Sequence, residues 1–311
     1  MAVFFVFLIL IVAAALAAST IIFYRMAVSR ASRIPANITG MEGFSDTNFQ
    51  KAVYETTQWM KENNCENWNM VSFDRLKLAA YFVPSLKPSA KTAILVNGYR
   101  SQGRWLGETA KFYFGLGFNV LVVDNRGSGE SEGDYIGFGW HERKDILAWV
   151  GRVLERFGEE SQIVLFGISM GGAAVMMASG EDLPKQVKAI IEDCGYTSAY
   201  DVLSYQIKSS FKLPPFPFVH LTSAFTKLKD GYSFFEASAV EQVKKSKVPI
   251  LFIHGEDDRM VPSWMVYKVH EACASEKELY VVKNAGHAGA SAVGGEEYDK
   301  KVTDFISRYV C

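Results

Sequence analysis

A serine lies between two glycines at residues 165–172, which read LFGISMGG. Gly167 stands two residues before Ser169, Gly171 stands two residues after it, and an apolar run precedes the segment. This G-x-S-x-G spacing, between a predicted buried strand and a helix of small residues, is typical of a serine that a sharp turn exposes as a nucleophile. The N-terminus of the following helix would favour a developing negative charge. A turn that simply needs small residues is the alternative interpretation.

A serine hydroxyl needs a general base, and the base needs a carboxylate that orients it. His287 follows the last predicted strand, in VVKNAGH, where a loop can carry it over the sheet. LFIHGEDDRMVP ends another predicted strand, and its spacing favours Asp258 as the carboxylate, with Asp257 as the alternative. The order Ser169, Asp258, His287 along the chain is that of α/β hydrolases.

The other histidines are weaker candidates for the base. His254 ends the strand before Asp258 and is predicted to be structural, whereas three more lie in helical or lid-like patterns: His141, His220 and His270.

An oxyanion hole needs two backbone N–H groups, one from the residue after the nucleophile and one from the loop after an earlier strand. We predict that Met170 and Tyr99 supply them, Tyr99 lying in NGYRSQG.

The N-terminal segment differs from the rest of the chain. From Ala2 to Tyr24 no residue is charged, and such a stretch is long enough to cross a bilayer as a helix. A signal peptide cleaved near Ala17 is the alternative, but no basic residue precedes the apolar run and apolar residues resume at Ile21. We therefore expect an uncleaved membrane anchor. Three arginines follow it and would place the main domain in the cytoplasm, although so small a bias leaves the side open: Arg25, Arg30 and Arg33.

Composition excludes several other classes of protein. The net charge of −1 and the 22% of charged residues do not suit a nucleic-acid-binding protein. The sequence contains no phosphate loop, dinucleotide fingerprint or metal-ligand cluster, so we expect no cofactor and no metal. The four cysteines lack the spacing of a zinc site and are predicted to be free thiols, with a disulfide left open: Cys65, Cys194, Cys273 and Cys311.

From residue 68 onward, short apolar runs alternate with amphipathic stretches. This alternation predicts a mostly parallel sheet with helices on both sides, and residues 69–83 predict an antiparallel hairpin at one edge. Residues 199–245 interrupt the alternation and predict a lid of two helices joined by a proline-rich turn. The strands are predicted at 69–73, 77–83, 92–97, 118–123, 162–166, 187–192, 249–254 and 278–282, and the helices at 104–116, 140–157, 170–180, 262–274 and 296–309.

Together these motifs resemble the α/β-hydrolase-fold serine hydrolases over about residues 68–310. The resemblance is strongest to membrane-anchored or secreted α/β hydrolases of low-GC Gram-positive bacteria, usually described as hydrolases or esterases. It implies an eight-stranded, mostly parallel sheet with a small helical lid, and structural roles for Asp124 and Arg126. The segments that carry the resemblance are ILVNGY, VVDNRGSGESEGDYIGFGWHER, FGISMGG, IEDCGYTSAYD, VPILFIHGEDDRMVP and NAGH.

The sequence departs from these relatives at the oxyanion loop, where Asn97-Gly98 stands in place of the usual His-Gly. The asparagine would either substitute without loss or shift the loop.

The chain is predicted to divide into a transmembrane anchor or signal peptide at residues 1–24, a linker at 25–50 and a catalytic domain at 51–311 with the lid inserted at 199–245.

Three functions compete at this stage. The favoured one is an esterase that acts on a small-molecule ester and contacts the membrane through the N-terminal helix. The second is a peptidase of the prolyl-aminopeptidase type, which would need acidic residues near the lid such as Asp230 and Glu236. The third is a non-catalytic sensor at the membrane.

Overall fold

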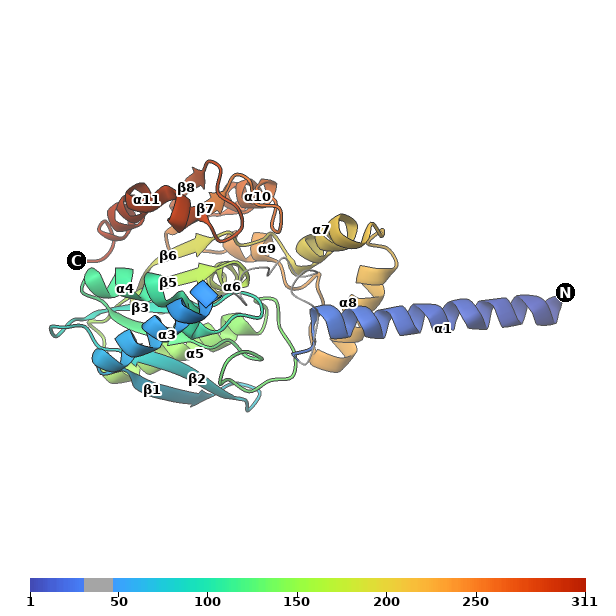
Figure 1. Ribbon diagram of the computed structural model, residues 1–311, viewed down its shortest axis with the longest axis horizontal. Coiled ribbons are helices and arrows are strands. Elements are labelled where there is room, and N and C mark those ends of the chain that lie inside the picture. Colours follow the sequence, from blue (N-terminus) through green and yellow to red (C-terminus); the bar gives the residue numbers. More distant parts are fainter. Residues whose placement is uncertain (31–46) are drawn as a thin grey trace.

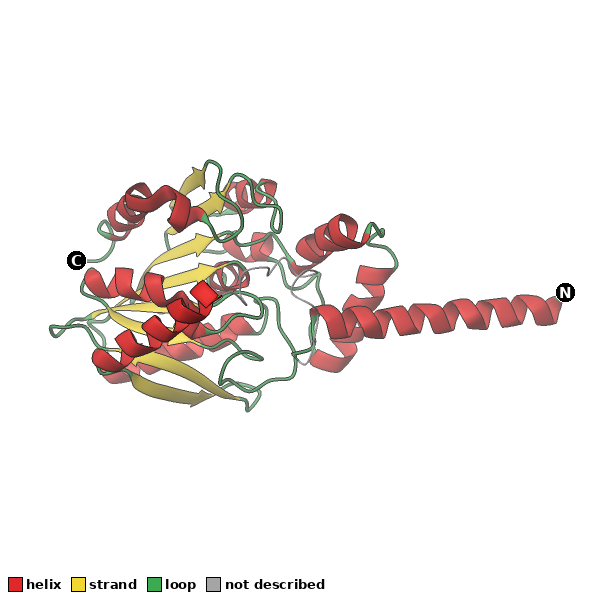
Figure 2. Cartoon of the chain, in the orientation of Figure 1, coloured by secondary structure: helices red, strands yellow, loops and turns green. Residues whose placement is uncertain are grey.

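Among residues 1–30 and 47–311, which the computed structural model describes, eight strands form one sheet with helices on both faces (Figures 1 and 2). The strand order is β1-β2-β4-β3-β5-β6-β7-β8. β2 pairs antiparallel with β1 and β4, and the other neighbouring pairs are parallel. The predicted mostly parallel sheet with an antiparallel hairpin at one edge is confirmed. The strands are β1 (Glu66–Val71), β2 (Lys77–Val83), β3 (Lys91–Val96), β4 (Asn119–Val123), β5 (Gln162–Ile168), β6 (Val187–Asp193), β7 (Ile250–Gly255) and β8 (Lys277–Val282).

The central strands are continuous apolar runs because both faces of the sheet are covered. Along β3, Ile94 and Val96 point into the core on one face, whereas Ala93 and Leu95 point into the core on the other. α5 (Glu142–Phe157), α6 (Met170–Ala178), α9 (Ala239–Val243) and α10 (Trp264–Ala272) cover the first face. The opposite face is covered by α3 (Thr47–Glu62), α4 (Gly107–Gly115) and α11 (Ala290–Ile306).

The helices differ from the prediction in four places. The helix expected at 104–116 is a 3-10 turn, η1 (Gly103–Leu106), followed by α4. The helix expected at 296–309 follows a break at Gly295, whose φ of 50° and ψ of −128° separate it from a short helical segment that starts at Ala290 and was not predicted. α3 and α9 were not predicted. The linker expected at 25–50 lies mostly outside the described residues.

The insertion between β6 and β7 contains the two predicted lid helices. They are α7 (Ala199–Phe211) and α8 (Phe218–Asp230), joined by the turn that contains the three prolines of LPPFP. α7 starts where the Ser198 side chain accepts a hydrogen bond from the Asp201 N–H, which satisfies one of the free donors at a helix start. α8 packs against the N-terminal helix α1 (Ala2–Ala27).

α1 projects away from the rest of the molecule over most of its length (Figure 1). Its residues Val3–Ala27 are long and apolar enough to cross a membrane, by length and composition. Only its last turns are packed: Thr20, Tyr24 and the following Val28 are buried.

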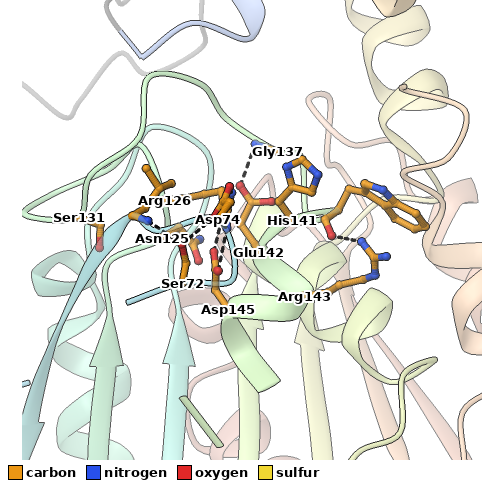
Figure 3. A network of polar contacts seen from close by, with 12 residues as sticks. Ser72, Asp74, Asn125, Arg126, Ser131, Gly137, His141, Glu142, Arg143 and Asp145 are labelled. Carbon is orange, nitrogen blue, oxygen red and sulfur yellow. Dashed lines mark hydrogen bonds and ion pairs between the residues drawn. The ribbon is translucent and has the colours of Figure 1, made fainter. Parts of the chain in front are cut away.

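A buried arginine joins the loops at one edge of the sheet (Figure 3). The Arg126 side chain is fully buried and donates to both carboxylate oxygens of Asp145, at 2.7 and 2.8 Å. It also donates to Asp74, at 2.7 and 3.2 Å, in the turn between β1 and β2. Burial acts to lower the pKa of Arg126, but the two carboxylates raise it above its ordinary value. The arginine therefore remains charged and ties the β1–β2 turn to α5, as the structural role expected for it requires.

We predict that Arg126→Ala lowers the free energy of unfolding by about 3–5 kcal/mol, because it leaves Asp145 buried without its partner. Urea unfolding of the full chain in detergent, followed by tryptophan fluorescence, measures the change. Arg152→Ala is the matched control, since Arg152 pairs with Glu155 on the surface and should cost less than about 1 kcal/mol. Equal losses for the two variants would contradict a stabilising role of the buried network.

Candidate active site

Ser169 lies in the turn between β5 and α6, with a φ of 57°. A non-glycine residue adopts this conformation only under constraint. The constraint comes from close packing on both sides of the turn. A Cβ on Gly167 would overlap the Gly171 carbonyl, and a Cβ on Gly171 would overlap the Val96 carbonyl at the end of β3. Both flanking glycines are therefore required by contact, which answers why small residues surround this serine.

The structure brings the three side chains expected to form a triad together. His287 Nε2 lies 2.8 Å from Ser169 Oγ, and His287 Nδ1 lies 2.7 Å from Asp258 Oδ2. Asp257, the alternative carboxylate, is exposed to solvent. The three residues follow β5, β7 and β8, whose carboxyl ends meet at one edge of the parallel sheet.

Asp258 is held in place by groups that favour its charged form. Its Oδ1 accepts hydrogen bonds from the N–H groups of Met260 and Val261, both at 2.8 Å. Burial acts to raise the pKa of Asp258, but hydrogen bonds from His254 and His287 outweigh burial and hold the pKa well below its usual value. The carboxylate is thus ionised and faces the imidazole.

His254 contacts the site from behind, a role that spacing alone did not indicate. Its side chain is fully buried. Its Nε2 lies 2.8 Å from the Val261 carbonyl oxygen and 3.4 Å from Asp258 Oδ2. The remaining histidines lie elsewhere. His141 contacts Tyr135 next to the Arg126 network, the His220 ring meets lid aromatic rings edge-on, and His270 lies on α10.

The loop after β3 faces Ser169. A Cβ on Gly98 would lie 3.4 Å from the Ser169 Cβ, so Tyr99 and Met170 flank the serine from two elements. The described hydrogen bonds include none donated by the backbone N–H of either residue. Asn97 fixes this loop, because its amide donates to the Gly98 and Ser101 carbonyls at 3.1 and 2.9 Å and accepts from the Asn125 N–H at 2.9 Å. The asparagine therefore ties the loop to its own backbone and to Asn125.

A cavity of about 180 Å³ adjoins Ser169. Its lining contains no charged side chain among the described residues, and it is built from the lid, from α1 and from the loops at the carboxyl edge of the sheet. Asp230 and Glu236, the acidic residues considered for a peptidase, are not part of the lining. Asp230 instead accepts a hydrogen bond from Tyr24, and Glu236 pairs with Lys227.

One set of potential metal ligands lies here among the described residues: Cys194, Asp258 and His287, with ligand atoms within 4.8 Å of one another. This set does not fit a metal site. A cysteine binds a metal as the thiolate, but burial raises the pKa of Cys194 well above its usual value and keeps it a thiol. Asp258 and His287 are already hydrogen-bonded to each other.

Two buried carboxyl groups lie behind the nucleophile turn, at the end of β6. Glu192 is fully buried and accepts the Gly195 N–H at 2.9 Å. Asp193 accepts from the Tyr298 hydroxyl at 2.9 Å, while its backbone carbonyl accepts the Ser169 N–H at 2.7 Å. Burial raises the pKa of Glu192 to about 8 and that of Asp193 to about 6. Glu192 is thus mostly protonated at neutral pH.

If folded Glu192 is protonated, the variant Glu192→Gln should gain stability relative to the wild type as the pH rises. Folded Glu192 keeps its proton up to about pH 8, whereas the unfolded chain releases it near 4.5. The folded state therefore binds more protons between these values, and its stability falls as the pH rises. Glutamine has no proton to release, so the variant should gain stability relative to the wild type between pH 5 and pH 8. Urea unfolding at both pH values tests this, with Glu155→Gln on the surface as control. A difference that does not change with pH would refute the protonated state.

Most of this chain can be aligned with known proteins. The Peptidase_S9 model, described as the prolyl oligopeptidase family, matches residues 105–311. YqkD of Bacillus subtilis, described as an uncharacterized protein, is 26% identical over 76% of this chain and 81% of its own length. Alpha/beta hydrolase domain-containing protein 17B of Xenopus laevis is 24% identical over 75% and 72%. A structure of the Pyrococcus furiosus esterase Pf2001 aligns with a TM-score of 0.67 and 25% identity, over 82% of this chain and 96% of that one.

The family match contains Ser169, Asp258 and His287, together with the whole lid, and it excludes α1.

Proposed function

The chain belongs to the prolyl oligopeptidase family, and we propose that it is a serine hydrolase that cleaves carboxylic esters. It has the α/β-hydrolase fold, and a solved structure with the same fold is an esterase. The observation that carries the proposal is the chain of hydrogen bonds from Ser169 through His287 to Asp258 beside an uncharged cavity.

In the proposed reaction, Ser169 Oγ attacks the ester carbonyl while His287 Nε2 takes its proton. The ionised Asp258 holds the Nδ1–H of His287 and stabilises the imidazolium. The N–H groups of Met170 and Tyr99 donate to the oxyanion of the tetrahedral intermediate. His287 then protonates the leaving alcohol, which gives an acyl-enzyme. Water, activated by the same histidine, attacks the acyl carbonyl and releases the acid and the free serine.

The lining of the cavity favours an ester with an apolar acyl group over a peptide with a free amino terminus. An aminopeptidase site needs an anionic group that pairs with the substrate's ammonium, and the described lining offers none. The polar side chains that the lid helices contribute to the lining are uncharged: Gln206, Ser210 and Thr222. We therefore place the peptidase second.

α1 is proposed to anchor the protein in a membrane. A cleavage near Ala17 would leave the buried Tyr24 and Val28 on the chain as well, so this proposal rests on the length and apolar composition of Val3–Ala27. The side of the membrane on which the hydrolase domain lies is not part of this proposal.

The first test is Ser169→Ala. We expect a fluorophosphonate probe to label the wild type and not the variant, and kcat on p-nitrophenyl esters to fall by about 10³-fold or more. Aminoacyl p-nitroanilides, assayed alongside, separate the esterase from the peptidase. A folded wild type that neither takes up the probe nor cleaves either substrate would favour the non-catalytic sensor.

A second test addresses the loop that Asn97 holds. Asn97→Ala removes the ties to the Gly98 and Ser101 carbonyls, so the Tyr99 N–H should be less well positioned and kcat should fall by about 10–100-fold, with KM little changed. Asn69→Ala, on the exposed side of β1, is the control and should keep full activity. If Asn97→Ala raised KM and left kcat intact, Asn97 would act on binding rather than on the oxyanion.

A further inference from the structure

The last turns of α1 form one wall of the cavity that adjoins Ser169. Phe23, Met26 and Ala27 belong to its lining. The Phe23 ring meets the Phe211 ring at the end of α7, with centroids 5.9 Å apart, and the Phe218 ring at the start of α8, at 5.5 Å. The cavity is thus closed on this side by α1 together with the lid.

The same end of α1 is bound to the loop that carries Tyr99. The Tyr99 hydroxyl donates to the Ala27 carbonyl at 2.9 Å, and the Arg100 guanidinium donates to the Met26 carbonyl at 2.7 Å. These carbonyls belong to the last turn of a helix, where no N–H of the helix itself remains to bind them. The loop next to the nucleophile therefore caps the helix.

A second set of contacts ties the end of α1 to the opposite side. The Ile136 N–H donates to the Val28 carbonyl at 2.8 Å, and the Arg30 N–H donates to the Asp134 carbonyl at 2.9 Å. The Arg30 guanidinium also donates to the Ser131 and Gly129 carbonyls, at 2.7 and 2.9 Å. α1 is thus built into the domain at its base and is more than a flexible tether.

The exposed part of α1 fixes the depth of the cavity relative to a bilayer. Residues 3–15 are all exposed, and burial begins near Thr20. At 1.5 Å per residue, the stretch from residue 2 to residue 19 spans about 27 Å, close to the ~30 Å of a hydrocarbon core. The membrane surface then lies near Thr20, and Met26 lies about 9 Å beyond it. The cavity wall begins within two helical turns of the bilayer.

The lid presents an interfacial surface at the same end of the molecule. α7 and α8 lie beside the base of α1, on the side from which α1 projects (Figure 1). The side chains of Phe211 and Phe216 are 37% and 69% exposed around the lid turn, next to the exposed Lys208 and Lys212. Exposed aromatic rings beside basic side chains are typical of a surface that rests in lipid headgroups.

We propose that the substrate is a membrane lipid ester, whose acyl chain enters from the adjoining leaflet and lies between α1 and the lid with its carbonyl at Ser169. This inference rests on the proposed esterase function and adds the substrate class. α1 then serves both as anchor and as a wall of the acyl site. The uncharged lining suits an alkyl chain, and a chain that passes from bilayer to cavity never crosses bulk water.

The first experiment tests the lipid site without requiring hydrolysis. The full chain carrying Ser169→Ala is placed in phosphatidylcholine vesicles that contain a lipid with a diazirine at the end of one acyl chain, and crosslinked residues are identified after irradiation. We expect crosslinks at Val202, Ile207 or Phe234, which line the cavity and are at most 7% exposed. Crosslinks confined to the exposed part of α1 and to Phe216 would overturn the proposal.

The second experiment compares two substrates of the otherwise wild-type full chain in the same vesicles. Mono-oleoylglycerol in the bilayer is compared with water-soluble p-nitrophenyl acetate. Met26→Trp fills the wall of the cavity, so the ratio of kcat/KM for oleoyl over acetyl ester should fall about 10-fold. Met26→Ala widens the cavity, is less prone to disturb folding, and should shift the preferred acyl length upward. Ile22→Trp, at an exposed position of α1, is the control and should leave the ratio unchanged.

The outcomes separate this inference from the function on which it rests. Hydrolysis of acetate that depends on Ser169, without crosslinks in the cavity and with an unchanged ratio in both Met26 variants, would leave the esterase in place and overturn the lipid substrate. Crosslinks in the cavity without hydrolysis of either ester would support the lipid site and overturn the proposed reaction.

Discussion

The candidate site depends on one close approach, that of the start of α6 to the end of β3. Gly171 lies against the Val96 carbonyl without room for a Cβ. This contact forces the chain to turn sharply after β5 and leaves Ser169 in a strained conformation with its side chain directed at the cavity. It also brings the loop of Gly98 and Tyr99 beside the serine. Strain at this turn is compatible with a stable fold because β5 and α6 are buried on all sides.

Around this turn, the groups that surround each buried carboxyl group decide whether it is ionised. Asp258 has two backbone N–H donors and two histidines, so it stays ionised although it is buried. Glu192 accepts one hydrogen bond, from a backbone N–H, and burial outweighs the attraction of the nearby His254, so its pKa is raised and it keeps its proton. Two carboxyl groups in one small region thus differ in charge because their hydrogen-bond partners differ.

The end of α1 is joined to this arrangement through ordinary helix chemistry. A helix that ends inside a protein must find partners for its last carbonyl groups. Here Tyr99 and Arg100 provide them, so the loop beside the nucleophile and the apolar helix are a single structural unit. The family match begins at residue 105, so α1 and the Tyr99 loop lie outside it.

Local patterns were enough to predict the eight strands, the two lid helices and the residue types of the candidate site, because buried runs and the G-x-S-x-G turn depend on near neighbours in the sequence. Ser169, Asp258 and His287 were chosen by their place at strand ends, but their hydrogen bonds exist only because parallel strands bring those ends to one edge. Two features had no local signal: the hydrogen bonds between Asn97 and Asn125, and the packing of α1 on the lid and the Tyr99 loop. Each joins segments that lie far apart in the sequence and that only the folded chain brings together, so only the tertiary structure decided them.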